Sequence, residues 1–177
     1  MLKIEKKYTI HILSVTAINC ETFDLPQEQN AVIVCTERIN RFVYTCKPEN
    51  ILILNFPDVE DYKYPGAFNG AHARKIISFI QNLSEQVTDI YVCCSKGGSR
   101  SPAVAAALLR MSGRSDKDVW LNPYYVPNTL VYLRLCQEYG LAVSKFSVRL
   151  RQIINEWAFR MAKKGRPCKY ERWQILE

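Results

Sequence analysis

Short apolar segments alternate along the chain with longer amphipathic ones. Four of the short segments are rich in β-branched residues and are bounded by turn-forming residues, a pattern that predicts β-strands. These predicted strands cover residues 8–15, 31–36, 51–56 and 90–93. The last two are each followed by a loop and then by a segment with helical periodicity.

Four segments predict helices because apolar residues recur in them every three or four positions. The first follows Pro65-Gly66, the second runs from Arg100 to Gly113, the third covers about 127–139 and the last about 144–165. The first helix has an apolar face made of Ala73, Ile76, Ile77, Ile80 and Leu83. The last has an apolar face made of Phe146, Leu150, Ile153, Ile154, Trp157 and Met161. Such a stripe is normally the side of a helix that packs on the core.

The order of these elements predicts the fold class. Strands that alternate with helices through short loops indicate an α/β fold, with a mostly parallel central sheet of four to five strands flanked by helices. A length of 177 residues suits one domain and is too short for two ordinary ones. We therefore expect a single domain over residues 1–177, with a core at about 7–165 and a basic C-terminal tail at 166–177.

Composition places the chain among soluble globular proteins, with 48% hydrophobic and 23% charged residues. No apolar stretch approaches the roughly 18 residues that span a bilayer, so we expect no transmembrane helix. His11 interrupts the first apolar segment and Glu5 precedes it, which favours a strand over a signal peptide. The seven cysteines are an odd number, mostly within apolar segments and without zinc-site spacing. They predict packing thiols in a reducing, cytoplasmic compartment.

The formal net charge of +7 favours anionic partners, such as nucleic acid, phospholipid surfaces or phosphorylated substrates. Residues 144–177 contain nine basic and three acidic residues, so nearly all of the excess belongs to the last helix and the tail. Basic residues there also suit a helix C-terminus and a solvated face. The net charge therefore gives no preference for nucleic acid.

The loop after the fourth predicted strand has the features of an anion-binding site. The strand delivers Cys94 onto a loop that contains Gly97 and Gly98 and opens directly into a helix at Arg100. Free loop amides, the positive end of the helix and the conformational freedom of glycine together form a cradle for phosphate. The same surroundings favour the nucleophilic thiolate of Cys94, while the planar fork of Arg100 can hold two phosphoryl oxygens.

The loop and the first turn of its helix read Cys94-Ser95-Lys96-Gly97-Gly98-Ser99-Arg100-Ser101. This segment resembles the CxxGxxR[ST] signature of the cysteine-dependent protein tyrosine phosphatases, and the chain is similar to their compact dual-specificity branch over about residues 51–139. The resemblance implies a phosphatase-type phosphate-binding loop between strand and helix. It also implies that Cys94 is the nucleophile, that the loop amides and Arg100 bind phosphate, and that the Ser101 hydroxyl hydrogen-bonds the thiolate.

Further site residues follow from the same resemblance. Phe56-Pro57-Asp58 resembles the family's Trp-Pro-Asp element, which implies that Asp58 is the general acid; Asp61, closer in sequence to Cys94, is a rival. Pro127-Asn128 resembles a Pro-Asn pair that opens a helix near the active site, so Asn128 is a candidate substrate contact or simply a helix cap. The loop residues Ser95, Lys96, Gly97, Gly98 and Ser99 complete the candidate substrate-binding set.

Three other positions bear on the predicted site. The family usually has His before the nucleophile, whereas this chain has Cys93, which strand alternation directs to the opposite face. We expect Cys93 to be a packing residue. Arg38 and Arg41, in the loop after the second strand, are candidates for contacting a substrate phosphate.

The expected function is phosphomonoester hydrolysis of the protein tyrosine or dual-specificity type, through a phosphocysteine intermediate on Cys94 and without a metal or cofactor. The expected partner is a phosphorylated protein or another phosphomonoester. Three alternatives stay open: an RNA 5'-triphosphatase or phosphoinositide phosphatase with a similar loop, a phosphate-binding pseudophosphatase, and a nucleic-acid-binding module that uses the basic C-terminal helix.

Overall fold

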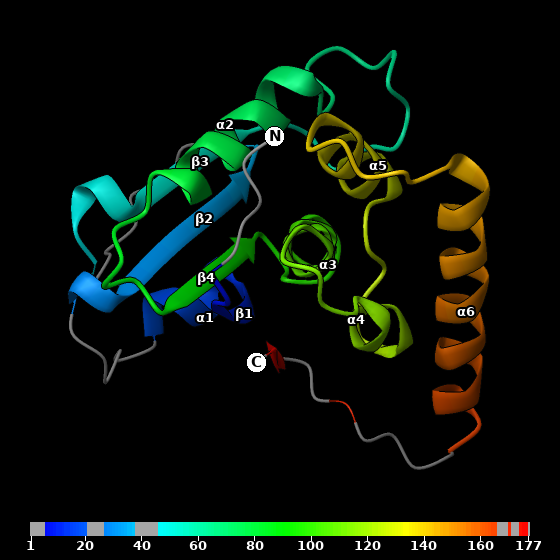
Figure 1. Cartoon of the computed structure of the whole chain (residues 1–177). Helices are drawn as coiled ribbons and strands as arrows, with labels where there is room; N and C mark the ends of the chain where they lie inside the picture. The colour runs from blue at the N-terminus through cyan, green and yellow to red at the C-terminus, as the bar shows by residue number, and fades with distance from the viewer. Residues whose placement is uncertain (1–5, 21–26, 38–45, 166–169, 171–173, 177) are drawn as a thin grey trace.

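A central five-stranded sheet organises the molecule (Figure 1). The computed structural model describes residues 6–20, 27–37, 46–165, 170 and 174–176. The strand order is β3-β2-β4-β1-β5; β5 runs antiparallel to β1, and the other neighbours are parallel. The strands are β1 (Thr9–Ser14), β2 (Asn30–Thr36), β3 (Ile51–Asn55), β4 (Asp89–Cys94) and β5 (Gln174–Leu176).

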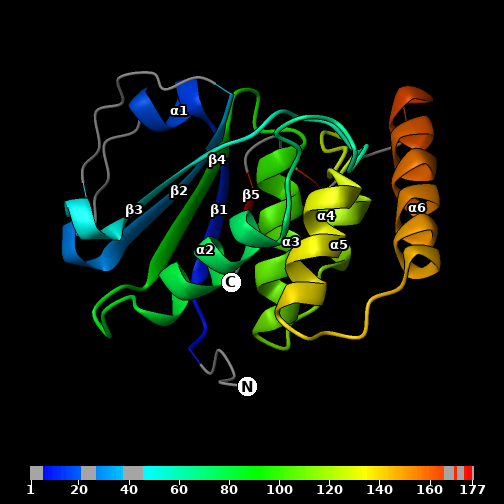
Figure 2. The same ribbon diagram turned by 90° about the horizontal axis from the view of Figure 1, so that it is seen from above.

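Helices cover both faces of this sheet. They are α1 (Val15–Cys20), α2 (Gly70–Gln81), α3 (Arg100–Met111), α4 (Lys117–Leu121), α5 (Thr129–Glu138) and α6 (Lys145–Lys163), with 3-10 turns at Gln27–Gln29 and Pro48–Asn50. The larger hydrophobic core joins one sheet face to residues of α2, α3, α4 and α5. The smaller core, on the other face, includes Ile18 of α1. Figure 2 shows α6 at the outer edge, beyond α4 and α5.

The predicted fold class is confirmed: the chain forms an α/β fold with a mostly parallel sheet flanked by helices, as a single compact domain. Central strands β2 and β4 are buried along their whole length, as expected for strands covered on both faces. The four predicted strands and four predicted helices all form, with ends within a few residues of those expected. In α2, Ala73, Ile76 and Ile80 are buried as the periodicity predicts.

Three short elements were not predicted. α1 has six residues, α4 has five and β5 has three, lengths at which hydrophobic periodicity carries little information. β5 lies within the predicted tail, yet it pairs with β1, and Leu176 belongs to the main core. The core therefore extends beyond residue 165, and the residues 166–169 and 171–173 of that tail lie outside the described part of the chain.

The prediction for the last helix was wrong about which side packs inward. Phe146, Leu150, Ile153, Ile154 and Trp157, taken from the sequence as the core-facing stripe, are all exposed. The buried residues of α6 are instead Val148, Asn155 and Ala158. Asn155 donates hydrogen bonds to three backbone carbonyls, and Arg151 pairs with buried Asp116, so polar contacts decide the orientation of this helix.

Five cysteines within the described residues are free and buried: Cys35, Cys46, Cys93, Cys94 and Cys136. Four of these have the packing role expected from the sequence, whereas Cys94 also lines a cleft. Over the part of the chain that the structure describes, none of the helices is both long and apolar enough to cross a bilayer.

Candidate functional site

A cleft of about 560 Å³ opens where β4 passes through the loop into α3. Cys94 ends the strand and Arg100 begins the helix, and both residues are almost fully buried, with 2% and 3% of their surface exposed. The Cys94 Sγ lies 3.2 Å from the Ser101 Oγ. The cleft is lined by Glu37, Asp58, Cys94, Ser95, Lys96, Gly97, Gly98, Ser99, Arg100, Tyr124 and Val126.

Two carbonyls of the loop are hydrogen-bonded to the segment that precedes α5. Gly97 has a φ of +69°, which a residue with a side chain rarely adopts. The Gly98 carbonyl accepts a 2.8 Å hydrogen bond from the Val126 amide, and the Ser99 carbonyl accepts from the Asn128 amide. Because N–H and C=O of one peptide unit point in opposite directions, the amides that follow these carbonyls face away from the 126–128 segment. This arrangement suits an anion held by main-chain donors.

The guanidinium of Arg100 is held at the base of the cleft, and one of its three nitrogens makes no hydrogen bond to the described residues. Its NH1 donates to the Phe56 carbonyl at 2.9 Å, and its NH2 donates to the Ser95 Oγ at 3.0 Å. Glu37 lies 3.4 Å from the NH1 and Asp58 lies 3.8 Å from the Nε. The buried Nε has no hydrogen-bond partner among the described residues. A buried donor without a partner is costly, so this position suits a ligand oxygen.

Asp58 lies in the same cleft, although 36 residues separate it from Cys94 in the sequence. Its Oδ1 accepts hydrogen bonds from the Ser99 Oγ at 2.9 Å and the Asn128 Nδ2 at 2.8 Å. Its backbone amide donates to Glu37 at 3.3 Å. These contacts come from three separate segments. The two contacts from Ser99 and Asn128 hold the Oδ1, and the Oδ2 lies toward Arg100.

The two aspartates considered as the acid have different surroundings. Asp61 does not line the cleft; its carboxylate accepts from the Lys63 amide and its carbonyl accepts from the Tyr64 amide, which makes it a turn residue. Asn128 is the helix cap considered for it and also contacts Asp58, while a contact with substrate stays a prediction. Its Oδ1 caps α5 by accepting from the Val131 amide, and its Nδ2 donates to Asp58.

Three lining residues were missed by the sequence analysis. Glu37 follows β2, the strand next to β4. Because the carboxyl ends of these parallel strands lie together, its position in the sequence could have predicted that it lines the cleft. Tyr124 and Val126 precede α5 and are more than half exposed at the cleft rim. No periodicity marks them, because their place depends on how α5 packs against α3. Arg38 and Arg41 lie outside the described residues.

The neighbouring cysteines do not compete with Cys94 for the cleft. Cys93 is fully buried in the smaller core on the opposite sheet face, as strand alternation predicts. Cys35 on β2 is paired in register with Cys94 and is also fully buried. Burial raises the pKa of both thiols, with further raising from the neighbouring Cys94, so Cys35 and Cys93 remain protonated at neutral pH.

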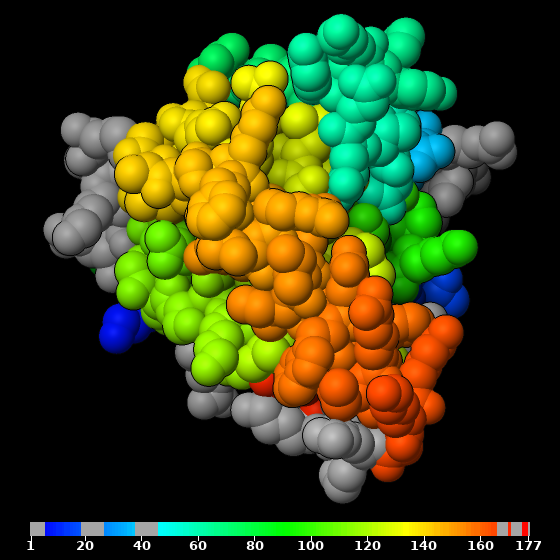
Figure 3. Space-filling model, turned by 90° about the vertical axis from the view of Figure 1, so that its right-hand side faces the viewer, coloured from blue at the N-terminus to red at the C-terminus, as the bar shows by residue number. Residues whose placement is uncertain are grey.

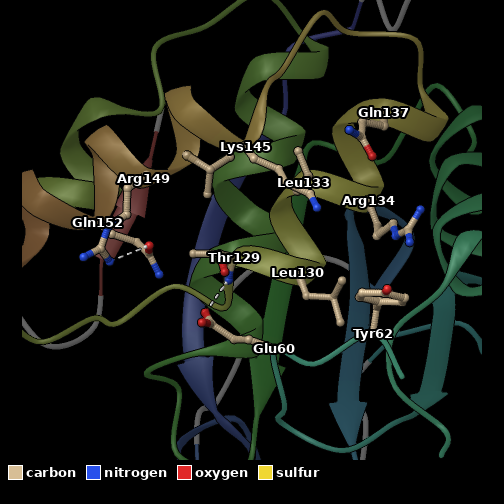
Figure 4. Close-up of a pocket in the computed structure, with 11 residues that line it drawn as sticks. Glu60, Tyr62, Thr129, Leu130, Leu133, Arg134, Gln137, Lys145, Arg149 and Gln152 are labelled. Atoms are coloured by element: carbon tan, nitrogen blue, oxygen red, sulfur yellow. Dashed lines mark hydrogen bonds between the residues drawn. The ribbon is translucent and has the colours of Figure 1, made fainter. Parts of the chain in front are cut away.

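A second cavity, of about 580 Å³, lies behind the segment that carries Asp58 (Figure 4). Thr129, the first residue of α5, donates its amide to Glu60 at 2.8 Å, and both residues line this cavity. Three cationic side chains, Arg134, Lys145 and Arg149, also line it. The segment 58–60 therefore borders two cavities, because Asp58 lines the cleft with the Cys94 thiol and Glu60 lines the cavity with the cations.

No protein-family model matches this chain, and no curated protein matches it. Within the described ranges, no group of three His, Cys, Asp or Glu side chains is arranged to hold a metal ion. The functional argument therefore rests on the geometry of the cleft.

Proposed function

We propose that the protein is a phosphomonoester hydrolase that works through a cysteine nucleophile. One observation carries the proposal: the Cys94 thiol, the Asp58 carboxylate and the unpaired Nε of Arg100 converge on one cleft from two separate segments. This is the group of a nucleophile, a proton donor and an oxyanion binder that phosphoryl transfer requires. Within this class, we propose a phosphatase of the protein tyrosine or dual-specificity type.

In the first step, the Cys94 thiolate attacks phosphorus and the bond between phosphorus and the leaving oxygen breaks. Protonated Asp58 transfers its proton to that oxygen, so an alcohol or phenol leaves. In the second step, water attacks the phosphocysteine, Asp58 takes a proton from the water, and the phosphorus–sulfur bond breaks. Inorganic phosphate and the Cys94 thiolate are released, and Asp58 is again protonated.

The remaining cleft residues have supporting roles in this proposal. Arg100 holds phosphoryl oxygens through its Nε and an NH2 that turns from the Ser95 hydroxyl, while the loop amides hold the others. The Ser101 hydroxyl, 3.2 Å from the Cys94 Sγ, donates a hydrogen bond to the thiolate when it departs from phosphorus. Ser99 and Asn128 orient the general acid by donating to the Asp58 Oδ1.

The rim of the cleft favours an aromatic phosphate ester as substrate. Tyr124 and Val126 present exposed apolar surface beside the loop, where a phenyl ring attached to the phosphate can pack. This supports phosphotyrosine, with phosphoserine or phosphothreonine as poorer substrates because their short alkyl chains contact less of this rim.

The test is hydrolysis of an aryl phosphate, a phosphotyrosine peptide, a soluble phosphoinositide headgroup and a 5'-triphosphate RNA by the wild type and Cys94→Ser. We expect the aryl phosphate and the phosphopeptide to be hydrolysed fastest, and Cys94→Ser to be inactive because serine lacks a populated anionic nucleophile. Cys46→Ala, which removes a buried thiol away from the cleft, is the matched control and keeps its activity.

Three results would contradict the proposal in whole or in part. Hydrolysis that persists in Cys94→Ser would exclude the phosphocysteine intermediate. Binding of the phosphopeptide by the wild type without turnover of any of the four substrates would indicate a pseudophosphatase. Fastest hydrolysis of the RNA or the headgroup would overturn the substrate assignment while leaving the nucleophile in place.

A further inference from the structure

The outer side of α6 carries a continuous apolar ridge. It consists of five exposed side chains, which we call the α6 ridge: Phe146, Leu150, Ile153, Ile154 and Trp157. Phe146 is 73% exposed and Trp157 is 54% exposed, values unusual for large apolar residues brought together on one helix. In Figure 3, the α6 segment, in orange, runs across the face of the molecule with its side chains uncovered.

Buried polar contacts on the inner side hold the ridge outward. The Asn155 Nδ2 donates to the carbonyls of Trp120, Asn122 and Tyr125, and the whole residue is only 5% exposed. Arg151 forms a 2.9 Å ion pair with Asp116. Rotating α6 to bury the ridge would break these bonds and leave buried polar groups without partners, which is unfavourable. The exposure of the ridge is therefore a property of the folded state.

The described part of the chain after α6 does not return over the ridge. Tyr170 donates a hydrogen bond to Asp118 of α4, and β5 pairs with β1 at the edge of the sheet. Because the five side chains of the ridge are also exposed, the ridge is open to a partner.

One side of the ridge is basic. Residues spaced three or four positions apart share a side of a helix, and such a row on α6 contains four exposed cations, one exposed acid and one half-buried amide. The row consists of Lys145, Arg149, Gln152, Glu156, Arg160 and Lys163. Lys145 and Arg149 also border the second cavity, where Arg134 of α5 adds a third cation (Figure 4). Figure 4 shows Arg149 and Arg134 on opposite sides of the hollow.

We propose that the α6 ridge binds anionic membrane surfaces, with α6 lying flat in the interface. Large apolar and aromatic side chains that project from one side of a helix, beside a row of Lys and Arg, are the features of an interfacial amphipathic helix. Phe146 and Trp157 enter the boundary between headgroups and acyl chains, and the basic row contacts anionic headgroups. The cavity that Arg134, Lys145 and Arg149 line receives a headgroup phosphate.

The charges and the shape of this face favour a membrane over two other partners. A second copy packed ridge to ridge with its α6 antiparallel would bring the two basic rows together, and like charges at such an interface are unfavourable. An amphipathic peptide is normally bound in an apolar groove. The cavity of about 290 Å³ between α4 and α6 is lined by only two ridge residues, Leu150 and Ile154, whereas Phe146, Ile153 and Trp157 lie outside it. The proposal is independent of the proposed phosphatase activity.

The test is sedimentation of the full chain with vesicles of phosphatidylcholine, alone or mixed with phosphatidylserine. We expect binding to the mixed vesicles and much weaker binding to the neutral ones. Phe146→Ser/Trp157→Ser lowers the partition coefficient by about tenfold or more, because it removes two large apolar side chains from the interface. Arg149→Gln/Arg160→Gln lowers it by about fivefold for each charge removed. Ile53→Ser is the matched control and binds like the wild type, since Ile53 is 42% exposed on β3, the strand that Figure 1 shows at the opposite side of the molecule from α6.

Trp157 provides a local readout. Its fluorescence emission shifts to the blue when anionic vesicles are added, and this shift is absent in Trp157→Phe, which still sediments with the vesicles. Equal binding to neutral and anionic vesicles would overturn the electrostatic part of the proposal. Absence of binding to both, or dimerisation that Trp157→Ser abolishes, would overturn the membrane assignment altogether.

Discussion

Single side chains in the cleft combine a structural role with a role in the proposed chemistry. Asn128 caps α5 through its oxygen and holds Asp58 through its nitrogen, so the amide that begins the helix also positions the proposed acid. Arg100 begins α3, and its Nε makes no hydrogen bond to the residues that the structure describes. In both cases the backbone position was readable from the sequence, whereas the partner of the side chain was not.

The choice between the two aspartates gives a prediction at the residue scale. Asp58→Asn removes the proton donor and lowers kcat for an aryl phosphate with a poor leaving group by about 10²–10⁴-fold, and by less when the leaving group is good. Asp61→Asn is the matched control, because Asp61 lies in a turn outside the cleft, and it changes kcat little. Steady-state rates over a series of aryl phosphates measure this, and a larger loss in Asp61→Asn would reverse the assignment.

At the scale of elements, α6 shows that a helix can be oriented by its polar residues. Its apolar stripe predicted that one face of the helix packs inward, but the contacts of Asn155 and Arg151 show that a different face does. Periodicity identifies the helix and the width of its stripe correctly. It does not reveal that a small, partly polar face of α6 meets the Asp116 carboxylate just before α4 and backbone carbonyls on α4 and in the segment after it.

Asn155→Ala should therefore destabilise the protein, although alanine has a better helix propensity than asparagine. Losing the amide leaves buried carbonyls of Trp120 and Tyr125 with one donor fewer, and we expect the free energy of unfolding to fall by about 1–3 kcal/mol. Glu156→Ala, at the next and exposed position, should stay within about 0.5 kcal/mol of the wild type. Denaturant unfolding measures both, and equal stabilities for the two variants would argue against this account of how α6 is held.

At the scale of the whole molecule, the C-terminal end closes the sheet. β5 covers the edge of β1 that would otherwise expose unpaired main-chain groups, and Leu176 adds to the main core. Three residues near the C-terminal end of the chain thus add the fifth strand to the sheet. The other four strands lie within the core predicted at about 7–165.

This closure predicts different effects for two neighbouring residues. Leu176→Ala should lower the free energy of unfolding by about 2 kcal/mol, because Leu176 is buried against the core. Ile175→Ala, on the same strand but 60% exposed, should change it by less than about 0.5 kcal/mol. If the two variants unfold at the same denaturant concentration as the wild type, β5 does not contribute to stability.

Much of this protein is determined by local sequence. Strands 31–36 and 90–93, the helix that begins at Arg100 and the loop between Cys94 and Arg100 all follow from apolar runs, glycines and spacing, which act over a few residues. The resemblance of that loop to a phosphatase signature needs no tertiary information either. These features are local because side-chain alternation along a strand, hydrogen bonding within a helix and glycine turns act over neighbouring residues.

The tertiary structure decided the rest, because it depends on contacts between residues far apart in sequence. The packing of α5 against α3 brings Asn128 to Asp58, and the register of β2 beside β4 brings Glu37 to the same edge. Packing against α4 turned the apolar side of α6 outward, since buried hydrogen bonds there outweigh burial of the stripe. The sequence by itself determined the loop and the polar groups that the proposed function uses, and the fold decided which of them meet and which surface remains open.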